Sequence, residues 1–302
     1  MSTCWSAEYW AQKGDVKLYM YRKLASAPVT GEAAPPVLFL VHGSSFSARS
    51  GFDLQVPGKL GYSLMETFAG YGFDVWTMDH EGYGKSDRTD GNSPISEGVR
   101  DLTAAMTVVE RETGRASHAF YGSSSGALRA AAFAEAHPEK VANLVLDAFV
   151  WTGEGSPTLI ERRKKLDQWR ASSMRSVDRA FFHSIFNRDK PGTSEDGIAD
   201  ALADAELPIC NEVPTGTYLD MCAYLPICDP EKIQCPTLIV RGEHDGIATE
   251  ADLLAYYEKL PVSDKQFVVV PGLAHVSYLG RNRARFLHVV RNFLEMPGRV
   301  DG

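Results

Sequence analysis

Short apolar runs alternate with helix-length segments along most of this chain of 302 residues. Residues 37–41 are wholly apolar, and residues 141–146 and 237–240 are nearly so. A strand with one face in water alternates apolar and polar side chains, whereas a continuous apolar run is typical of a strand buried on both faces. Parallel strands also need long crossovers, which the intervening helical segments can supply. The sequence therefore predicts an α/β fold with a mostly parallel sheet covered by helices on both sides.

Other segments continue this rhythm. Apolar residues recur at three- and four-residue steps between Val99 and Val109, which predicts a helix over residues 95–113. Further strands are expected at residues 16–24, 73–78, 117–121 and 266–270. Further helices are expected around residues 61–71 and at residues 127–136, 250–260 and 281–296.

The rhythm breaks between residues 151 and 233, where the chain is polar and helical. We expect a helical cap inserted over the top of the sheet, so that residues 1–150 and 234–302 form one core domain. A charged run occupies residues 161–165 of this insertion. It is either an anion site or a solvated helix face, and we favour the solvated face.

A Gly-x-Ser-x-Gly pattern, at residues 122–126, lies between an expected strand and an expected helix. Ligand sites of open α/β sheets form at the carboxyl ends of the strands, which is where this turn lies. A sharp strand-to-helix turn exposes the central hydroxyl, and the flanking glycines avoid Cβ clashes there. The helix N-terminus adds positive potential beside it. The glycine spacing selects Ser124, and not its neighbours Ser123 and Ser125, as the candidate nucleophile.

A His-Gly-Ser-Ser loop follows the strand at residues 37–41 directly. Acyl transfer needs hydrogen-bond donors for the oxygen that becomes negative in the transition state, and loss of one donor costs about 3 kcal/mol. We expect the backbone amides of Ser44 and Ser125 to form this oxyanion hole. His42 is expected to hold the loop by hydrogen bonds and not to act as the catalytic base.

Two aspartates are candidates for orienting a catalytic histidine. Asp245 ends a Gly-Glu-His-Asp sequence after the strand at residues 237–240, and Asp147 ends the strand at residues 141–146. We favour Asp245, because we expect the loop to present its fourth residue. Asp147 is kept as an alternative, whose other role is to cap the start of the insertion, and Glu243 and His244 are adjacent alternatives.

His275 follows the strand at residues 266–270 and precedes the last helix. An imidazole at this place can take the proton of the Ser124 hydroxyl and return it to the leaving group. The order Ser124, Asp245, His275 is the nucleophile–acid–histidine order expected for this architecture.

Residues 16–296 resemble the α/β-hydrolase superfamily. The resemblance rests on the His-Gly loop, the Gly-x-Ser-x-Gly turn, Asp245, His275 and residues 79–87, which look like the Asp-x-x-Gly-x-Gly-x-Ser turn of these enzymes. It implies an eight-stranded sheet, a helical cap at residues 151–233 and a Ser-His-Asp triad, with the turn at residues 79–87 shaping a loop without a catalytic role. The chain looks most like capped esterases, lipase-like enzymes and carbon–carbon bond hydrolases. Ser123, where relatives often carry a larger or more polar residue, is a departure that bears on pocket shape and not on the triad.

The sequence does not match the motifs that bind common cofactors and metals. Gly84-Lys85-Ser86 suggests a phosphate-binding loop, but that motif needs a glycine at position 79, where this chain has Asp. Four of the five cysteines lie between residues 210 and 235, with spacings that match no common zinc site and no histidine among them. We therefore expect free thiols in a reducing compartment, no metal and no cofactor.

The charge balance bears on partners. A net charge of −8 disfavours nucleic acid and anionic membranes, which select clustered Lys and Arg. The N-terminus does not resemble a signal peptide, and the apolar runs are far shorter than the roughly 18 residues of a membrane span. We expect a cytoplasmic protein that acts on a small molecule; the sequence leaves a homo-oligomer open.

The expected activity is hydrolysis of a carboxylic ester or lactone by a serine hydrolase through an acyl-enzyme. Apolar clusters at residues 181–186 and 218–225 favour a small to medium, apolar substrate, although such stripes more often seat one helix on another. An amide or a carbon–carbon bond beside a carbonyl would suit the same triad, because function follows the site and not the fold. A slow or non-catalytic ligand receptor is a further alternative, disfavoured by the presence of all three triad candidates. An epoxide or halide hydrolase needs a carboxylate nucleophile, which Ser124 is not.

Overall fold

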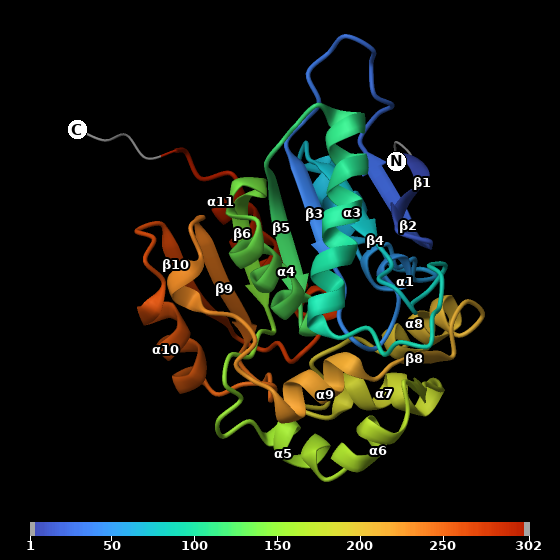
Figure 1. Cartoon of the computed structure of the whole chain (residues 1–302), viewed down its shortest axis with the longest axis vertical. Helices are drawn as coiled ribbons and strands as arrows, with labels where there is room; N and C mark the ends of the chain where they lie inside the picture. The colour runs from blue at the N-terminus through green and yellow to red at the C-terminus, as the bar shows by residue number, and fades with distance from the viewer. Residues whose placement is uncertain (1–3, 299–302) are drawn as a thin grey trace.

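The computed structural model describes residues 4–298. An eight-stranded sheet runs through it, with helices on both faces and a further group of helices beyond one end of the strands (Figure 1). The strand order is β1-β2-β4-β3-β5-β6-β9-β10. Strand β2 is antiparallel to both of its neighbours, and the other pairs are parallel. The predicted α/β class and the mostly parallel eight-stranded sheet are confirmed.

The elements follow one another much as the sequence predicts. The strands of the large sheet are β1 (Trp5–Lys13), β2 (Val16–Leu24), β3 (Val37–Val41), β4 (Asp74–Met78), β5 (His118–Ser123), β6 (Val141–Asp147), β9 (Thr237–Gly242) and β10 (Lys265–Val270). The helices around it are α1 (Ala48–Phe52), α2 (Leu64–Gly70), α3 (Ile95–Thr113), α4 (Ser125–Ala136), α10 (Glu250–Lys259) and α11 (Arg283–Leu294), with short 3-10 turns η1 (Pro138–Lys140) and η3 (Ser277–Leu279). Within residues 4–298, no helix has both the length and the apolar content that crossing a membrane would require.

The central strands are buried on both faces, which explains their uninterrupted apolar sequences. In β3, Val37, Phe39 and Val41 belong to the core cluster under α3, α4 and α10. Leu38 and Leu40 point the other way, into the cluster formed with α2 and α11. Each β3 side chain is therefore removed from water, and burial of an apolar side chain of this size contributes roughly 1.5–3 kcal/mol.

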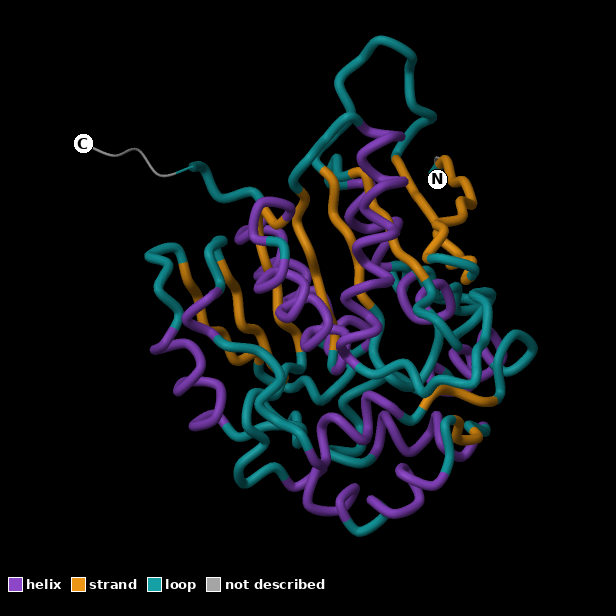
Figure 2. The backbone as a smooth tube through the Cα atoms, viewed as in Figure 1, coloured by secondary structure: helices purple, strands orange, loops and turns teal. Residues whose placement is uncertain are grey.

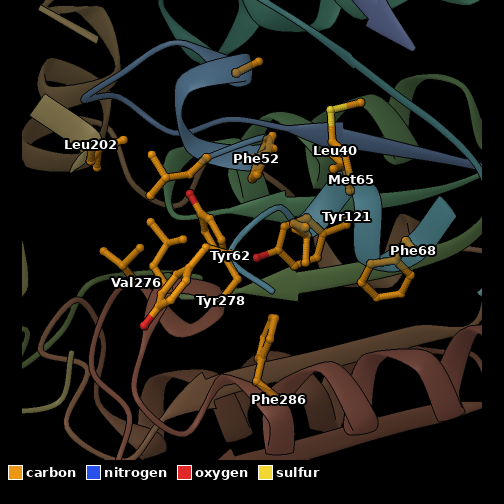
Figure 3. Packing of buried hydrophobic residues seen from close by; sticks show 14 of the residues in the cluster. Leu40, Phe52, Tyr62, Met65, Phe68, Tyr121, Leu202, Val276, Tyr278 and Phe286 are labelled. Carbon is orange, nitrogen blue, oxygen red and sulfur yellow. The ribbon is translucent and has the colours of Figure 1, made fainter. Parts of the chain in front are cut away.

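Figure 3 shows the second of these clusters from close by. Leu40 and Tyr121 from the sheet lie among Met65 and Phe68 of α2 and Phe286 of α11. Segments far apart in the sequence thus pack together on one face of the sheet.

Strand β1 is the one strand of the large sheet that our sequence-based prediction lacks. Its side chains alternate between half-buried and exposed positions along most of its length, as expected for a strand with one face in water. It forms an antiparallel hairpin with β2, in which Lys13 is the partner of Val16, and Gly14 supplies the positive φ of 57° that the turn requires. The alternation from Trp5 to Lys13 is the signal that could have identified this strand.

We refer to residues 151–233 as the inserted segment. It contains α5 (Pro157–Arg163), α6 (Leu166–Ala171), α7 (Arg179–Asn187), α8 (Ile198–Glu206), α9 (Gly216–Ala223) and the turn η2 (Pro230–Lys232), together with β7 (Met174–Ser176) and β8 (Glu212–Pro214). In Figure 1, α5, α6, α7 and α9 lie together below the ends of the strands. Figure 2 shows that the segment is mostly helix and loop, as expected, but β7 and β8 form an antiparallel pair that was not predicted.

The inserted segment leaves the sheet after β6 and returns at β9, and these two strands pair in parallel beside each other. It leaves at the carboxyl end of β6 and returns at the amino end of β9, so its two ends lie at opposite ends of neighbouring parallel strands. Treating it as a separate cap domain stays a prediction.

Candidate active site

Ser124 lies in the tight turn between β5 and α4, at the carboxyl end of a central strand. Its φ of 59° and ψ of −126° are rare for a residue with a side chain, and such strain costs about 1–3 kcal/mol. Two backbone hydrogen bonds hold the turn: the Ser124 N–H donates to the Asp147 carbonyl at 2.9 Å, and the Ser124 carbonyl accepts from Ala127 N–H at 2.9 Å. The surrounding structure thus maintains a conformation that lifts the Ser124 side chain above the strand.

The two glycines of the pattern allow α4 to begin this close to the sheet. A Cβ on Gly122 would lie 2.4 Å from the carbonyl oxygen of Gly126. A Cβ on Gly126 would lie 2.1 Å from the carbonyl oxygen of Val41. These are backbone atoms, which cannot move aside without disturbing the sheet, so both positions require glycine.

Gly126→Ala is expected to lower the free energy of unfolding by about 3 kcal/mol, because the added methyl group overlaps the end of β3. Urea denaturation followed by circular dichroism measures this change. Gly70→Ala is the matched control: Gly70 ends α2, and no atom from another described part of the chain lies within 4 Å of the place that the added methyl group would take. The same substitution there should stabilise slightly or change little. Equal midpoints for the two variants would contradict the tight packing at Gly126.

The structure brings Ser124, His275 and Asp245 into one chain of hydrogen bonds. The Ser124 hydroxyl lies 3.0 Å from Nε2 of His275, and Nδ1 of His275 lies 2.8 Å from Oδ1 of Asp245. A carboxylate only accepts, so Nδ1 carries the hydrogen and leaves Nε2 as an acceptor for the Ser124 hydroxyl. Both His275 and Asp245 are buried. This is the geometry in which a neutral imidazole can remove a proton from an alcohol.

The loop after β9 holds the Asp245 carboxylate in its charged form. Oδ1 also accepts from the Ile247 N–H at 3.0 Å, and the Arg241 side chain donates to the Asp245 carbonyl at 2.6 Å. Burial alone would raise the pKa of Asp245, but the charge and hydrogen bond of His275, with the Ile247 amide, hold this pKa below its usual value. Asp245 can therefore stabilise a protonated His275 at neutral pH.

Asp147, the alternative acid, lies in a different environment. Its Oδ2 accepts from the Tyr121 hydroxyl at 2.7 Å. Burial raises the pKa of Asp147 to about 7, against the lowering effect of the hydrogen bond from Tyr121. Within residues 4–298, no hydrogen bond joins Asp147 to His275.

The loop after β3 lies against Ser124. A Cβ on Gly43 would be 3.2 Å from Cβ of Ser124, and the hydroxyls of Ser44 and Ser125 are 2.6 Å apart. Ser125 is the first residue of α4, so its N–H has no acceptor within the helix. The two predicted oxyanion-hole residues are thus neighbours beside Ser124.

His42 holds this loop through both ring nitrogens. Nδ1 donates to the Gly43 carbonyl at 2.7 Å, and Nε2 accepts from the His80 N–H at 3.1 Å. Burial, together with the nearby His80 and Arg129, lowers the pKa of His42 well below its usual value, so the ring stays neutral. Because both nitrogens are occupied, His42 is not placed to act as a base.

The turn at residues 79–87 fixes two loops to each other. Oδ1 of Asp79 accepts from Ala48 N–H at 2.8 Å, and Oδ2 accepts from Lys85 N–H at 2.9 Å. Gly84 has a positive φ of 51°, and the Asp79 carboxylate fills the place of its missing Cβ. The Asp79 carboxylate thus accepts hydrogen bonds from backbone amides and holds the shape of the loop.

A cavity of about 800 Å³ opens above Ser124 and His275. Most of its wall comes from the inserted segment. Phe181 and Ile185 line it, as the apolar cluster at residues 181–186 suggests, whereas Phe182 is buried in the core away from it. Our interpretation of residues 161–165 as a solvated face agrees with four of these residues, which are exposed. It is wrong for Arg162, which is partly buried and lines the cavity.

Among residues 4–298, two groups of side chains have the composition of a cation site. Asp189 lies close to Asp245 and His275, so the first group shares two members with the hydrogen-bonded chain. The second is formed by Glu81, Glu97 and Asp101. The Lys13 ammonium donates to all three of these carboxylates and occupies the position that a cation would take.

Comparisons with known proteins agree with this fold. The model of the family described as serine aminopeptidase, S33 matches residues 58–279. The structure is similar to that of a thermophilic esterase from Thermogutta terrifontis, with a TM-score of 0.69 and 18% identity over 95% of this chain and 98% of that one. It is equally similar to 2-hydroxy-6-oxo-6-phenylhexa-2,4-dienoate hydrolase from Rhodococcus sp. strain RHA1, with a TM-score of 0.69 and 17% identity over 97% of this chain and 100% of that one.

A curated protein of Mycoplasma genitalium with esterase/lipase in its name is 34% identical over 65 residues. The match spans 22% of this chain and only 24% of that relative.

Proposed function

This chain belongs to the serine aminopeptidase S33 family of α/β hydrolases, and we propose that it cleaves carboxylic esters or lactones through an acyl-enzyme on Ser124. The observation that carries the proposal is the hydrogen-bonded chain from Ser124 through His275 to Asp245 beneath a large cavity. An alcohol becomes nucleophilic when an adjacent base removes its proton, and a third group orients that base.

The reaction proceeds in two halves. The Ser124 oxygen attacks the substrate carbonyl while Nε2 of His275 takes the hydroxyl proton, and Asp245 stabilises the resulting imidazolium. The amides of Ser44 and Ser125 bind the oxygen that becomes negative. His275 then gives its proton to the departing alcohol, which leaves the acyl group on Ser124. In the second half, His275 activates a water molecule that releases the acid and restores the serine.

Esters are favoured over the amides that the family description suggests. Both the Thermogutta terrifontis structure and the Mycoplasma genitalium relative are named as esterases. Hydrolysis of a carbon–carbon bond beside a carbonyl is the second candidate. It is supported by the equal structural similarity to the Rhodococcus hydrolase, whose name describes a substrate of that kind.

The test is a panel of matched substrates: 4-nitrophenyl esters of increasing acyl length, a lactone, the corresponding 4-nitroanilide and a dienoate carrying a vinylogous diketone. We expect the highest kcat/KM for esters, with a burst of nitrophenol that matches the enzyme concentration as the acyl-enzyme forms. The preference for esters is contradicted if the anilide or the dienoate is cleaved with a clearly higher kcat/KM than every ester.

A further inference from the structure

Two guanidinium groups flank one phenol ring in the wall of the cavity. Cζ of Arg162 lies 4.2 Å from the centre of the Tyr218 ring, and Cζ of Arg175 lies 4.1 Å from it. Arg162 comes from α5, Arg175 from β7 and Tyr218 from α9, so three separate elements of the inserted segment converge here. All three side chains line the cavity that also exposes Ser124 and His275.

Neither guanidinium has an acidic partner among the described residues. Nη1 of Arg162 and Nε of Arg175 are buried without any hydrogen-bond partner. By contrast, Arg188, on the same cavity wall, pairs through both Nε and Nη2 with Asp189 at 2.8 Å. Burying a charge without a counter-charge is costly, so this pair of arginines lacks the anion that would complete it.

The acidic groups on the cavity wall do not supply that anion. Asp189 is held by Arg188, and Glu161 pairs with Lys164 at 2.6 Å. Burial alone would raise the pKa of Tyr218, yet the charges of Arg162 and Arg175 lower it to about 8. The phenol therefore lies in a positive potential that the protein leaves uncompensated.

Arg162 and Arg175 are linked to the part of the cavity that contains Ser124 by a hydrogen bond from Arg175. Nη2 of Arg175 donates to the Ser44 carbonyl at 2.8 Å, and Ser44 lies beside Ser124 and Ser125. Because the arginines and Ser124 line one cavity, a single molecule can place an anionic group at the arginines and a carbonyl at Ser124. Phe181 and Ile185 offer an apolar surface in the same cavity for the carbon chain between the two groups.

Resting on the hydrolase function proposed above, we propose that Arg162 and Arg175 form a carboxylate subsite, so that the substrate is an ester or lactone carrying a second, ionised carboxylate. The planar guanidinium fork matches a carboxylate in shape, and both guanidinium groups lie against the Tyr218 ring. The carboxylates of Glu161 and Asp189 on the same wall disfavour a dianion such as phosphate.

The kinetic test compares two substrates that differ only at the distal carboxyl group, which is ionised in mono-4-nitrophenyl adipate and neutral in its methyl ester. The wild-type enzyme should prefer the acid in kcat/KM by about 10- to 100-fold, the range expected for hydrogen bonds to a charged group. Arg162→Gln should reduce this preference by about tenfold or more, chiefly through KM for the acid. Among the described residues Arg162 makes no side-chain hydrogen bond, so its replacement leaves no hydrogen-bond partner unsatisfied and removes the contact with the Tyr218 ring; the melting temperature of the variant verifies folding.

The matched control is Arg170→Gln. Arg170 lies in α6 of the same segment, is exposed and pairs with Asp167 at 3.5 Å, outside the cavity. This variant removes the same charge and should keep the preference for the acid. An equal loss of preference in both variants would reduce the subsite to a general effect of net charge and overturn it.

A binding test separates this proposal from the hydrolase function. Adipate should raise the melting temperature of the Ser124→Ala protein and of Ser124→Ala/Arg170→Gln, but not of Ser124→Ala/Arg162→Gln. If no ester is hydrolysed and this pattern still holds, the hydrolase function fails and the subsite stands. If esters are hydrolysed without preference and adipate has no effect, the subsite fails alone. Stabilisation by inorganic phosphate, and not by adipate, would overturn the assignment to a carboxylate.

Discussion

Replacing Ser124 by alanine is expected to lower kcat for ester hydrolysis by about 10⁴- to 10⁶-fold, because the attacking oxygen is lost while the binding cavity stays intact. The Ser124 hydroxyl is the one that lies 3.0 Å from Nε2 of His275. Stopped-flow measurement of nitrophenol release gives kcat, and the burst that reports the acyl-enzyme should vanish with it.

Ser123→Ala is the control for this experiment. The Ser123 hydroxyl is buried and donates to Oδ2 of Asp147 at 3.4 Å, and not to His275, so the variant should keep most of its activity. A fluorophosphonate probe, followed by peptide mass mapping, should label Ser124 and neither neighbouring serine. Comparable activity in Ser124→Ala and wild type, or labelling at Ser123 or Ser125, would refute the assignment of the nucleophile.

Asp245→Asn is expected to reduce kcat by about 10⁴-fold with little loss of folding stability. An amide at this place donates to Nδ1 of His275, so the ring carries its hydrogen on Nε2 and can no longer accept the Ser124 proton. It also removes the charge that stabilises the imidazolium. The same stopped-flow assay measures the loss.

Asp147→Asn should leave most of the activity, because no hydrogen bond connects Asp147 to the histidine among the described residues. The reverse outcome, with Asp147→Asn inactive and Asp245→Asn active, would exchange the two assignments.

Asp147→Asn should also change how the free energy of unfolding depends on pH. Burial raises the pKa of Asp147 to about 7, so the folded protein retains a proton that the unfolded chain, with a pKa near 3.9, releases. The stabilisation from this proton is complete below about pH 4 and is lost as pH rises through 7. Asparagine has no proton to lose, so Asp147→Asn should gain stability relative to wild type between pH 4 and pH 8, by on the order of 4 kcal/mol. Urea denaturation at the two pH values measures this gain.

The sequence predicts the sheet well where burial leaves a strong pattern. The run Val37–Val41 is apolar throughout because side chains of β3 enter both cores, and α3 is predicted with its bounds correct because its apolar residues recur at helical steps. Strand β1 was missed because one of its faces meets water, so it offers alternation and not an apolar run. The β7 and β8 pair was missed because each strand is three residues long, too short for any periodicity.

The residues of the candidate site also divide into those that the sequence predicts and those that it does not. Ser124, Asp245 and His275 could be found because each follows a strand of the sheet, and parallel strands end at one edge. For Arg162 the sequence offers an anion site only as the less favoured alternative, because a charged residue on a short polar helix is usually solvated. Its place in the cavity wall depends on Tyr218, whose ring also contacts Arg175, and these residues come from other elements and share no sequence pattern with Arg162.

The two ends of the inserted segment leave from adjacent strands, β6 and β9, which pair directly with each other. Ser124, Asp245 and His275, which we propose to cleave the bond, lie on the chain before and after this segment, whereas most of the residues that line the cavity lie within it. Substitutions within the segment can therefore change the cavity wall while the strand register and these three residues stay in place. The same three reactive residues can in this way act on a different substrate when only the cavity wall changes.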